Sequence, residues 1–209
     1  MTCKFCLFRC SWSMLTKFFH SWAAKKQPKP LRLFLLGTAG IGITTAIQTA
    51  LQELQKKLAA TGLTRNFVRV AAPTGSAAFN IRFNATTVHR LIRWFNPRFF
   101  EELKNPDKLH ELQEHLSQTQ ILLFDEVSMI GRKMMGRISS RMGQAAATDN
   151  PLHELCGGFS LVCVGDPAQC QAIFDQQIYD TDVHPETTKT PLAQKVQLSN
   201  SGLELYNSF

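Results

Sequence analysis

The sequence predicts an α/β protein built on a doubly wound, mostly parallel β-sheet with helices on both faces. Two observations indicate this fold. Four short apolar runs are nearly continuous, as in parallel strands buried on both faces, and they span residues 31–36, 67–72, 120–124 and 159–164. Segments with helical spacing lie between them, so right-handed crossovers are expected. The 209 residues suffice for one such domain, which should occupy residues 31–209.

Each predicted helix has an apolar face whose residues recur every three or four positions. The three faces are Ile47, Leu51, Leu54 and Leu58; Leu109, Leu112 and Leu116; and Ile130, Met134, Ile138 and Met142. We interpret the methionines as core residues, because methionine fills irregular gaps in apolar cores. An apolar fraction of 44% agrees with a globular protein.

Residues 1–30 are predicted to be a basic tail that ends in a linker. Residues 1–52 hold seven of the 23 Lys and Arg and none of the 16 acids, which leaves 16 of each sign for the rest. The net charge of +7 therefore belongs to the N-terminal end and does not by itself indicate a nucleic-acid-binding domain. The acid-free start fits a mitochondrial presequence, a disordered basic arm or a misassigned first exon, and these alternatives stay open.

The six cysteines do not suggest a secreted disulfide framework, and we expect an intracellular protein, in the nucleus or the mitochondrion. Cys3, Cys6 and Cys10, with His20 downstream, could bind zinc, but the spacing lacks the second ligand pair of structural zinc sites. No apolar run approaches the roughly 20 residues that span a bilayer, so no membrane contact is expected. The sequence does not indicate whether the protein is a monomer or an oligomer.

A glycine-rich loop, Gly37-Thr38-Ala39-Gly40-Ile41-Gly42-Ile43-Thr44, joins the first predicted strand to the first predicted helix. It matches the phosphate-binding pattern G-x-x-x-x-G-K-[ST] except at residue 43, where isoleucine replaces lysine. The glycines let backbone N–H groups point at phosphate oxygens, and the helix N-terminus adds partial positive charge. The loop predicts a nucleotide site in which the hydroxyl of Thr44 or Thr45 reaches Mg²⁺. An ordinary glycine-rich turn is the alternative.

Two adjacent acids, Asp125 and Glu126, follow the third apolar run directly. At the carboxyl edge of a parallel sheet, Asp125 suits a Mg²⁺ ligand, either directly or through water. Glu126 suits a general base that orients and deprotonates an attacking water. A solvated acidic turn is the alternative, although a pair of acids directly after a buried strand is uncommon for such a turn.

The fourth apolar run leads into Gly165-Asp166-Pro167-Ala168-Gln169. Gln169 could contact a γ-phosphate with its amide, although Gly-Asp-Pro also forms ordinary turns. The glycine loop, the acid pair and the glutamine occur in this order, each at a predicted strand end. Together they predict a RecA-like P-loop NTPase core that binds ATP and Mg²⁺.

Residues 72–81, Ala-Pro-Thr-Gly-Ser-Ala-Ala-Phe-Asn-Ile, carry a family resemblance. They resemble the segment between the glycine loop and the acid pair of the PIF (petite integration frequency) helicases, superfamily-one enzymes related to RecD and to Helitron helicases. Thr87-Val88-His89, Cys156-Gly157-Gly158 and Leu198-Ser199-Asn200 resemble later elements of that family. The likeness covers about residues 31–209, which correspond to the family's first RecA-like domain.

The resemblance implies an ATP-dependent DNA helicase that unwinds DNA in the 5′-to-3′ direction, in DNA repair, recombination and telomere maintenance. By the same resemblance, the residues that bind nucleotide are Gly37, Gly42 and Thr44. Asp125 would bind Mg²⁺, Glu126 would activate water, and Gln169 would sense the γ-phosphate. The residues where the family binds single-stranded DNA are Pro73, Thr74 and Gly75, with His89 as a further candidate.

Three departures distinguish the chain from the family. Ile43 replaces the loop lysine, and residues 170–173, Cys-Gln-Ala-Ile, replace the usual Leu-Pro-Pro-Val. The chain also stops at Phe209, before the expected second RecA-like domain with its arginine finger, so we expect residues 1–209 alone not to unwind DNA. The alternative function is a catalytically defective, transposon-derived remnant that binds nucleotide or DNA weakly. A P-loop kinase or GTPase is a weaker alternative, because neither has a reason to carry residues 72–81 or a Gln after Gly-Asp. No guanine-reading N-K-x-D sequence is present either.

Residues 89–100 interleave basic and aromatic side chains, a mixture that proteins use to bind single-stranded DNA. Packing on the domain is expected instead for Leu91, Ile92 and Phe95. Packing and DNA contact stay equal alternatives for Trp94, Phe99 and Phe100.

Overall fold

The computed structural model describes residues 29–38, 40, 42–60, 67–95, 100–146, 155–183 and 191–209. These residues form a five-stranded sheet in the order β1-β5-β4-β2-β3, and every neighbouring pair of strands is parallel. The strands are β1 (Arg32–Leu36), β2 (Val68–Ala72), β3 (Thr86–Thr87), β4 (Ile121–Phe124) and β5 (Ser160–Gly165). The predicted α/β fold with a doubly wound parallel sheet is confirmed.

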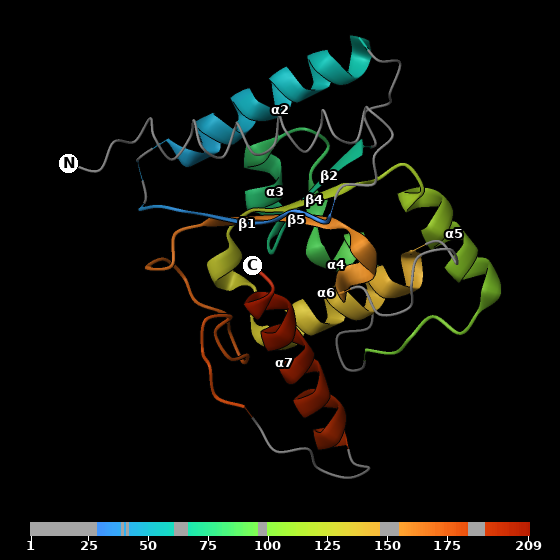
Figure 1. Cartoon of the computed structure of the whole chain (residues 1–209). Helices are drawn as coiled ribbons and strands as arrows, with labels where there is room; N and C mark the ends of the chain where they lie inside the picture. Colours follow the sequence, from blue (N-terminus) through green and yellow to red (C-terminus); the bar gives the residue numbers. More distant parts are fainter. Residues whose placement is uncertain are drawn as a thin grey trace.

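Helices cover both faces of the sheet (Figure 1). They are α2 (Ile43–Ala60), α3 (Gly75–Ile81), α4 (Val88–Leu91), α5 (Pro106–Leu116), α6 (Arg132–Ala145) and α7 (Pro191–Asn207), with short 3-10 turns η2 (Val127–Met129) and η3 (Leu155–Gly158). In Figure 1, α2 and α3 lie above the sheet, whereas α4, α6 and α7 lie below it. The described residues therefore form three layers, helix on sheet on helix.

The apolar runs are continuous because every strand except β3 contributes side chains to two hydrophobic cores. Along β4, Ile121 and Leu123 join the core under α2, whereas Leu122 and Phe124 join the core formed with α4 to α7. Side chains alternate between the two faces of a strand, so both sets of positions must be apolar when both faces are covered. This explains why the sequence shows runs rather than alternation.

The strand β3 was not predicted. Its two residues pair with the end of β2, Ala71 with Thr86 and Ala72 with Thr87, and form the edge of the sheet. A two-residue edge strand of threonines has no apolar run of its own, so no local pattern announces it. Its backbone pairs with β2, so its position is set by a tertiary contact.

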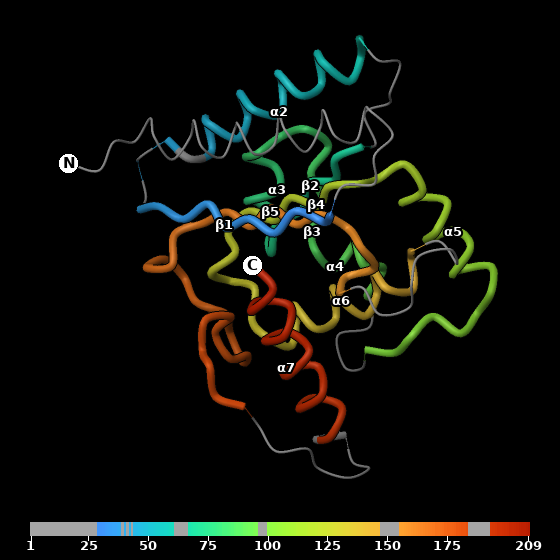
Figure 2. The backbone as a smooth tube through the Cα atoms, viewed as in Figure 1, coloured from blue at the N-terminus to red at the C-terminus, as the bar shows by residue number. Residues whose placement is uncertain are grey.

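The last helix returns to the first strand. In Figure 2, the C-terminal end of the chain lies just below β1. The ring of Phe209 packs on that of Phe34 in β1, with centroids 4.2 Å apart, and the ring of Tyr206 lies 5.4 Å from Phe34. Helix α7 thus covers the lower face of β1, which would otherwise expose its apolar side chains.

Candidate nucleotide and DNA site

The three predicted phosphate-site segments begin at one edge of the sheet. Strands β1, β5 and β4 are neighbours, and all run in the same direction, so their carboxyl ends meet at a common rim. The backbone N–H of Gly37 donates to the carbonyl of Gly165 at 3.2 Å, which ties the glycine loop to the start of the Gln169 segment. Ligands of open parallel sheets bind at this edge.

The glycine loop has a backbone that can approach a phosphate closely. Gly40 and Gly42 have φ of 79° and 85°, and a Cβ at either position would meet no atom within 4 Å. The carbonyl of Gly42 accepts from the N–H of Ala46 at 2.9 Å, and α2 begins at Ile43. Ala39, Ile41 and the side chain of Ile43 lie outside the described residues.

Most of the described loop residues are exposed, which fits an open binding loop. Thr38, Gly40, Gly42, Thr44 and Thr45 are all exposed. The positions beside the Cα atoms of Gly40 and Gly42 are also open, so the described loop residues do not block the approach of a ligand there.

Three carboxylates lie close together at the same rim. Asp125 is buried, and burial raises the pKa of its carboxyl. Burial, and then the charges of Asp125 and Asp166, raise the pKa of Glu126. Glu126 has a left-handed backbone, with φ of 51°, which turns the chain out of β4. No ion pair to Asp125 or Glu126 occurs within the described part of the chain, so a cation here would offset their mutual repulsion.

These carboxylates fit a Mg²⁺ ion held together with a nucleotide. Among the described residues, no group of three or more His, Cys, Asp or Glu could hold a metal ion by itself, so other ligands would have to complete the shell. Protein-bound Mg²⁺ commonly takes one or two carboxylates and completes its shell with water and substrate phosphates. Asp125 and the exposed Thr44 are the residues that would hold it, and they agree with that pattern.

Gln169 lies in a tight turn after β5. The carboxylate of Asp166 accepts from the N–H of Ala168 at 2.9 Å, and its carbonyl accepts from the N–H of Gln169 at 3.1 Å. Gln169 is exposed, so its amide is accessible to a ligand at the rim.

The predicted DNA-binding residues lie beyond β2, one strand further along the same edge. Pro73 and Thr74 follow β2, and Gly75 begins α3. The hydroxyl oxygen of Thr74 accepts from the N–H of Ala77 at 3.2 Å and caps α3, which leaves its O–H free to donate. His89 is exposed on α4, next to β3.

His89 is one layer of an aromatic stack that the sequence did not reveal. Its ring stacks on Trp94, with centroids 4.9 Å apart and planes 16° apart. The guanidinium of Arg137, on α6, lies 4.1 Å from the centroid of Trp94. Burial, and then the charge of Arg137, lower the pKa of His89, which favours a neutral imidazole.

Packing on the domain therefore accounts for two of the three aromatic residues for which packing and DNA contact were equal alternatives. Trp94 and Phe100 are buried, with their rings edge to face at 6.2 Å. Leu91 and Ile92 are buried as predicted. The expectation for Phe95 was wrong, because its side chain is 76% exposed: the chain leaves α4 through a turn after Leu91 that directs Phe95 to solvent. Phe99 lies outside the described residues.

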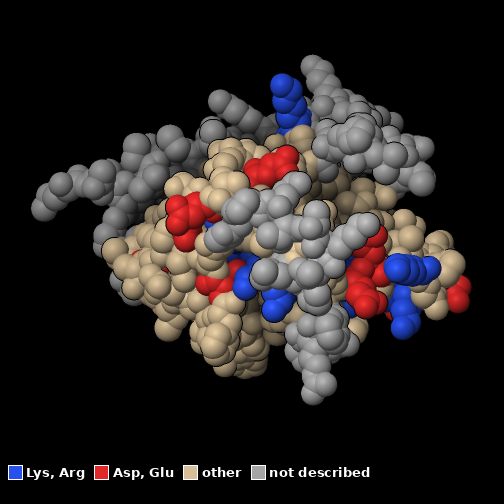
Figure 3. Space-filling model, turned by 90° about the horizontal axis from the view of Figure 1, so that it is seen from below, with Lys and Arg blue, Asp and Glu red and all other residues tan. Residues whose placement is uncertain are grey.

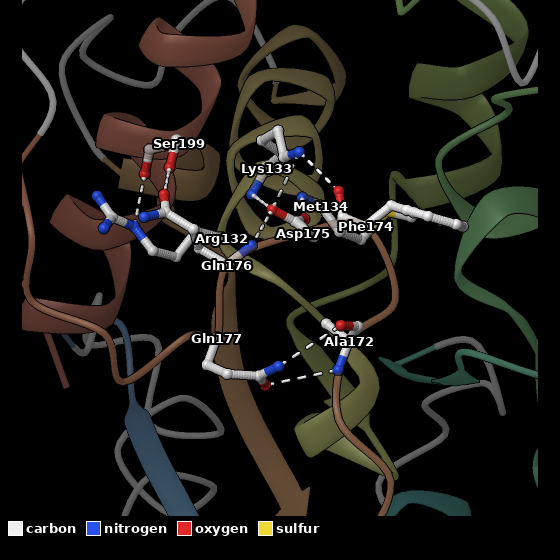
Figure 4. A network of polar contacts seen from close by, with 9 residues as sticks. All are labelled: Arg132, Lys133, Met134, Ala172, Phe174, Asp175, Gln176, Gln177 and Ser199. Carbon is white, nitrogen blue, oxygen red and sulfur yellow. Dashed lines mark hydrogen bonds and ion pairs between the residues drawn. The ribbon is translucent and has the colours of Figure 1, made fainter.

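A polar network ties the segment after Gln169 to α6 and α7 (Figure 4). Asp175 accepts from the backbone N–H groups of Lys133 and Met134 at the start of α6, at 3.2 and 3.1 Å. The amide of Gln177 makes two 3.5 Å contacts with the backbone of Ala172. The sequence signal for this network is Gly131. It stands at the N-cap of α6 and has no side chain to cap the helix, so the cap must come from elsewhere.

The other sequence expectations concern metal and membrane. Cys3, Cys6, Cys10 and His20 lie outside the described residues. No helix within the described ranges is both long and apolar enough to cross a membrane. Cys163 is fully buried, and burial raises its pKa, which fits a core residue rather than a reactive thiol.

Comparison with known proteins gives one family. A family model described as AAA domain matches residues 22–175. ATP-dependent DNA helicase Pif1 of Psychrobacter sp. (strain PRwf-1) is 27% identical over 139 residues, which cover 64% of this chain and 19% of that protein. ATP-dependent DNA helicase RRM3 of Saccharomyces cerevisiae is 25% identical over 140 residues, which cover 66% of this chain and 18% of that protein. The chain thus matches less than a fifth of the length of either relative.

Solved structures show the same fold. The crystal structure of Pif1 helicase from Candida albicans has a TM-score of 0.58 at 17% identity, covering 94% of this chain and 37% of that one. That of Bacteroides sp Pif1 in complex with ADP-AlF4 has a TM-score of 0.51 at 26% identity, covering 75% and 33%.

The parallel sheet with a glycine loop at its carboxyl rim defines the class of this protein as a RecA-like, P-loop nucleotide-binding fold. The chain belongs to the AAA domain family, and it is a RecA-like domain of the Pif1 family of superfamily-one helicases.

Proposed function

We propose that this domain binds ATP with Mg²⁺ at the carboxyl rim of its sheet, as part of a 5′-to-3′ DNA helicase acting in DNA repair, recombination and telomere maintenance. The observation that carries the proposal is the adjacency of β1, β5 and β4, which brings the glycine loop, Gln169 and the acid pair to one edge. The relatives named as ATP-dependent DNA helicases, and the similar structure solved with ADP-AlF4, support it.

Each rim residue would have a distinct role. The N–H groups of residues 37–45, including Gly37 and Gly42, would bind the phosphates. Thr44 and Asp125 would hold Mg²⁺, which neutralises phosphate charge when it is bound. Glu126 would orient the attacking water and accept its proton, and the raised pKa of Glu126 suits a base. Gln169 would donate its amide N–H to the γ-phosphate.

The proposed DNA ligand is single-stranded DNA along residues 73–75 and His89. The O–H of Thr74 and the exposed N-terminal end of α3 would donate to the DNA backbone. His89 is exposed on one face of its stack with Trp94, so it could contact a base or a sugar.

A second candidate function follows from Ile43. Without the lysine, the rim carries three carboxylates and lacks the cation that normally reaches the phosphates. A charge-assisted hydrogen bond contributes about 1.5–3 kcal/mol, so its loss would weaken nucleotide binding or transition-state stabilisation roughly tenfold to more than a hundredfold. The domain could then bind nucleotide or DNA without significant hydrolysis.

Titration of labelled ATP separates these functions. The parent chain, Ile43→Lys and the uncharged control Ile43→Met are titrated with and without Mg²⁺. If the loop binds phosphates, Ile43→Lys should bind ATP about tenfold or more tightly than the parent, and Ile43→Met should not. Equal affinities of all three would show that the loop does not contact phosphate. An increase in affinity without ATP hydrolysis would favour the second function.

A further inference from the structure

We propose that Phe79, on the exposed face of α3, is a base-stacking residue for single-stranded DNA. This inference rests on the proposed binding of DNA at residues 73–75. It assigns to the chain an aromatic contact with the bases, in addition to contacts with the DNA backbone.

Phe79 is exposed in a way that its own domain does not explain. Its side chain is 83% exposed, although Ala78 and Ile81 of the same helix are buried. At 100° per residue, Phe79 falls on the exposed side of α3, between Gly75 and Ser76 in helical projection. The rise of an α-helix places it about 6 Å along the axis from Gly75. The ring is thus one turn from the proposed backbone contacts.

In the sequence, α3 lies within a stretch whose charge is of the sign that attracts nucleic acid. Residues 54–100 contain no Asp or Glu and eight Lys and Arg, namely Lys56, Lys57, Arg65, Arg69, Arg82, Arg90, Arg93 and Arg98. The balance of charge over the whole domain conceals this local excess. By contrast, the face shown in Figure 3 has acidic and basic side chains interspersed.

One of these arginines lies close to Phe79 along the chain. Arg82 directly follows α3, three residues after Phe79, and is exposed. Arg90 is also exposed, but it lies on α4, on the other face of the sheet from α3 (Figure 1). Neither arginine has an ion pair within the described part of the chain, whereas Arg93 pairs with Glu111 at 2.6 Å. An exposed aromatic ring near an exposed arginine such as Arg82 is the combination that binds single strands by stacking and charge.

Phe174 shows that exposure alone does not define such a site. Its side chain is 96% exposed, but it precedes Asp175 and lies in a segment that also carries Asp180 and Asp182. That segment would repel a phosphate backbone. Phe174 is therefore the matched control: a similarly exposed phenylalanine outside the acid-free stretch that contains Phe79.

The test uses fluorescence anisotropy at low salt with two labelled single strands, oligo(dT) and an abasic strand of equal length. The chains are the parent, Phe79→Ala, Phe79→Tyr and Phe174→Ala. Base stacking gives roughly 1–3 kcal/mol per base, so Phe79→Ala should weaken oligo(dT) binding about fivefold or more. Phe79→Tyr and Phe174→Ala should bind like the parent. The parent should prefer oligo(dT) to the abasic strand, and Phe79→Ala should lose most of this preference.

Two results would overturn the inference. One is that Phe79→Ala binds oligo(dT) like the parent, and the other is that it weakens binding to both strands equally. If the parent itself binds neither strand, the proposed DNA binding fails, and the stacking role fails with it. Thermal unfolding of each variant checks that the fold is intact, which is expected because both phenylalanines are exposed.

Discussion

The carboxylate of Asp175 occupies the space that a side chain at Gly131 would fill. A Cβ added to Gly131 would collide with Cβ, Cγ and Oδ2 of Asp175. From this position Asp175 accepts from two backbone N–H groups of α6 and lies 3.6 Å from the ammonium of Lys133. Helix α6 is therefore capped by a residue 44 positions further along the chain, and the missing side chain at Gly131 makes this possible.

A double-mutant cycle tests this relationship. Gly131→Ala should lower the free energy of unfolding by about 1–3 kcal/mol, because the new Cβ displaces Asp175. Asp175→Ala should cost about 1–2 kcal/mol through the lost cap and the lost helix-dipole interaction. In the Asp175→Ala background, Gly131→Ala should cost clearly less, because the collisions with Cγ and Oδ2 are gone and only that with Cβ of residue 175 remains. The φ of −80° at residue 131 itself suits alanine. Urea unfolding of the four proteins measures the coupling. If the losses in free energy of unfolding of the two single variants add up in the double variant, the cap by Asp175 does not depend on the missing side chain at Gly131.

Arg132 is expected to be irreplaceable by lysine. Its side chain is fully buried, and its guanidinium donates to the carbonyls of Ser199, Asp180 and Asp182. A lysine ammonium cannot reach carbonyls on α7 and on the preceding segment at once. Arg132→Lys should therefore lower the free energy of unfolding by about 2–4 kcal/mol, since hydrogen bonds to charged groups contribute about 1.5–3 kcal/mol each.

The control for Arg132 is Arg90→Lys. Arg90 is exposed, so its substitution should change stability by no more than about 0.5 kcal/mol. Chemical denaturation of both variants gives the comparison. A loss for Arg132→Lys as small as that for Arg90→Lys would show that the buried guanidinium does not hold α6 to α7.

Gln48 links the proposed nucleotide site to the proposed DNA site. Its Nε2 donates to the carbonyl of Asn80 at 3.2 Å and joins α2, which follows the glycine loop, to the end of α3. In the Ile43→Lys background, Gln48→Ala should reduce the effect of ATP and Mg²⁺ on oligo(dT) affinity, measured by anisotropy. Stability should change by no more than about 1 kcal/mol, because this hydrogen bond is exposed.

Gln52, exposed one turn further along α2, is the matched control for Gln48. Gln52→Ala should retain the full effect of nucleotide on DNA affinity. If Gln48→Ala also retains it, the two segments are not coupled through this hydrogen bond.

Stability should depend on pH through Glu126, whose pKa is raised by burial and by the charges of Asp125 and Asp166. A carboxyl whose pKa rises on folding stabilises the folded state below its unfolded pKa, and this contribution is lost as the pH rises through the folded pKa. Glu126→Gln removes that titration. At about pH 7.5 the variant should be more stable than the parent, and the difference should shrink as the pH falls toward about 4.

Thermal unfolding over this pH range measures the effect, with Glu204→Gln on the exposed surface of α7 as control. Glu204→Gln should be no more stable than the parent at either end of the pH range. A gain for Glu126→Gln that is the same at both ends would mean that charge repulsion is not its cause.

Local patterns predicted most of the rim. The apolar runs predicted four of the five strands, because a strand covered on both faces must be apolar at every position. Polar residues at the ends of these runs then had to meet at one edge, because parallel strands align their carboxyl ends. The prediction that the glycine loop, Asp125 and Gln169 lie at a common edge followed from this geometry alone.

Side-chain environments were not predictable in the same way. Packing and DNA contact were equal alternatives for Trp94 until Arg137, 43 residues away, was found over its ring. Phe95 was expected to be buried and is exposed. Both outcomes depend on which distant helix covers a short turn, and no periodicity in the sequence records that.

The sequence by itself determined the order of the strands along the chain, the chemistry at their ends and the isoleucine at the phosphate loop, because these are local properties of apolar runs and turns. Only the tertiary structure decided how Asp175 caps α6, how Arg132 joins α6 to α7, and that Phe79 faces solvent. These features require residues far apart in the chain to come together, and burial and charge are set only when the helices have packed on the sheet.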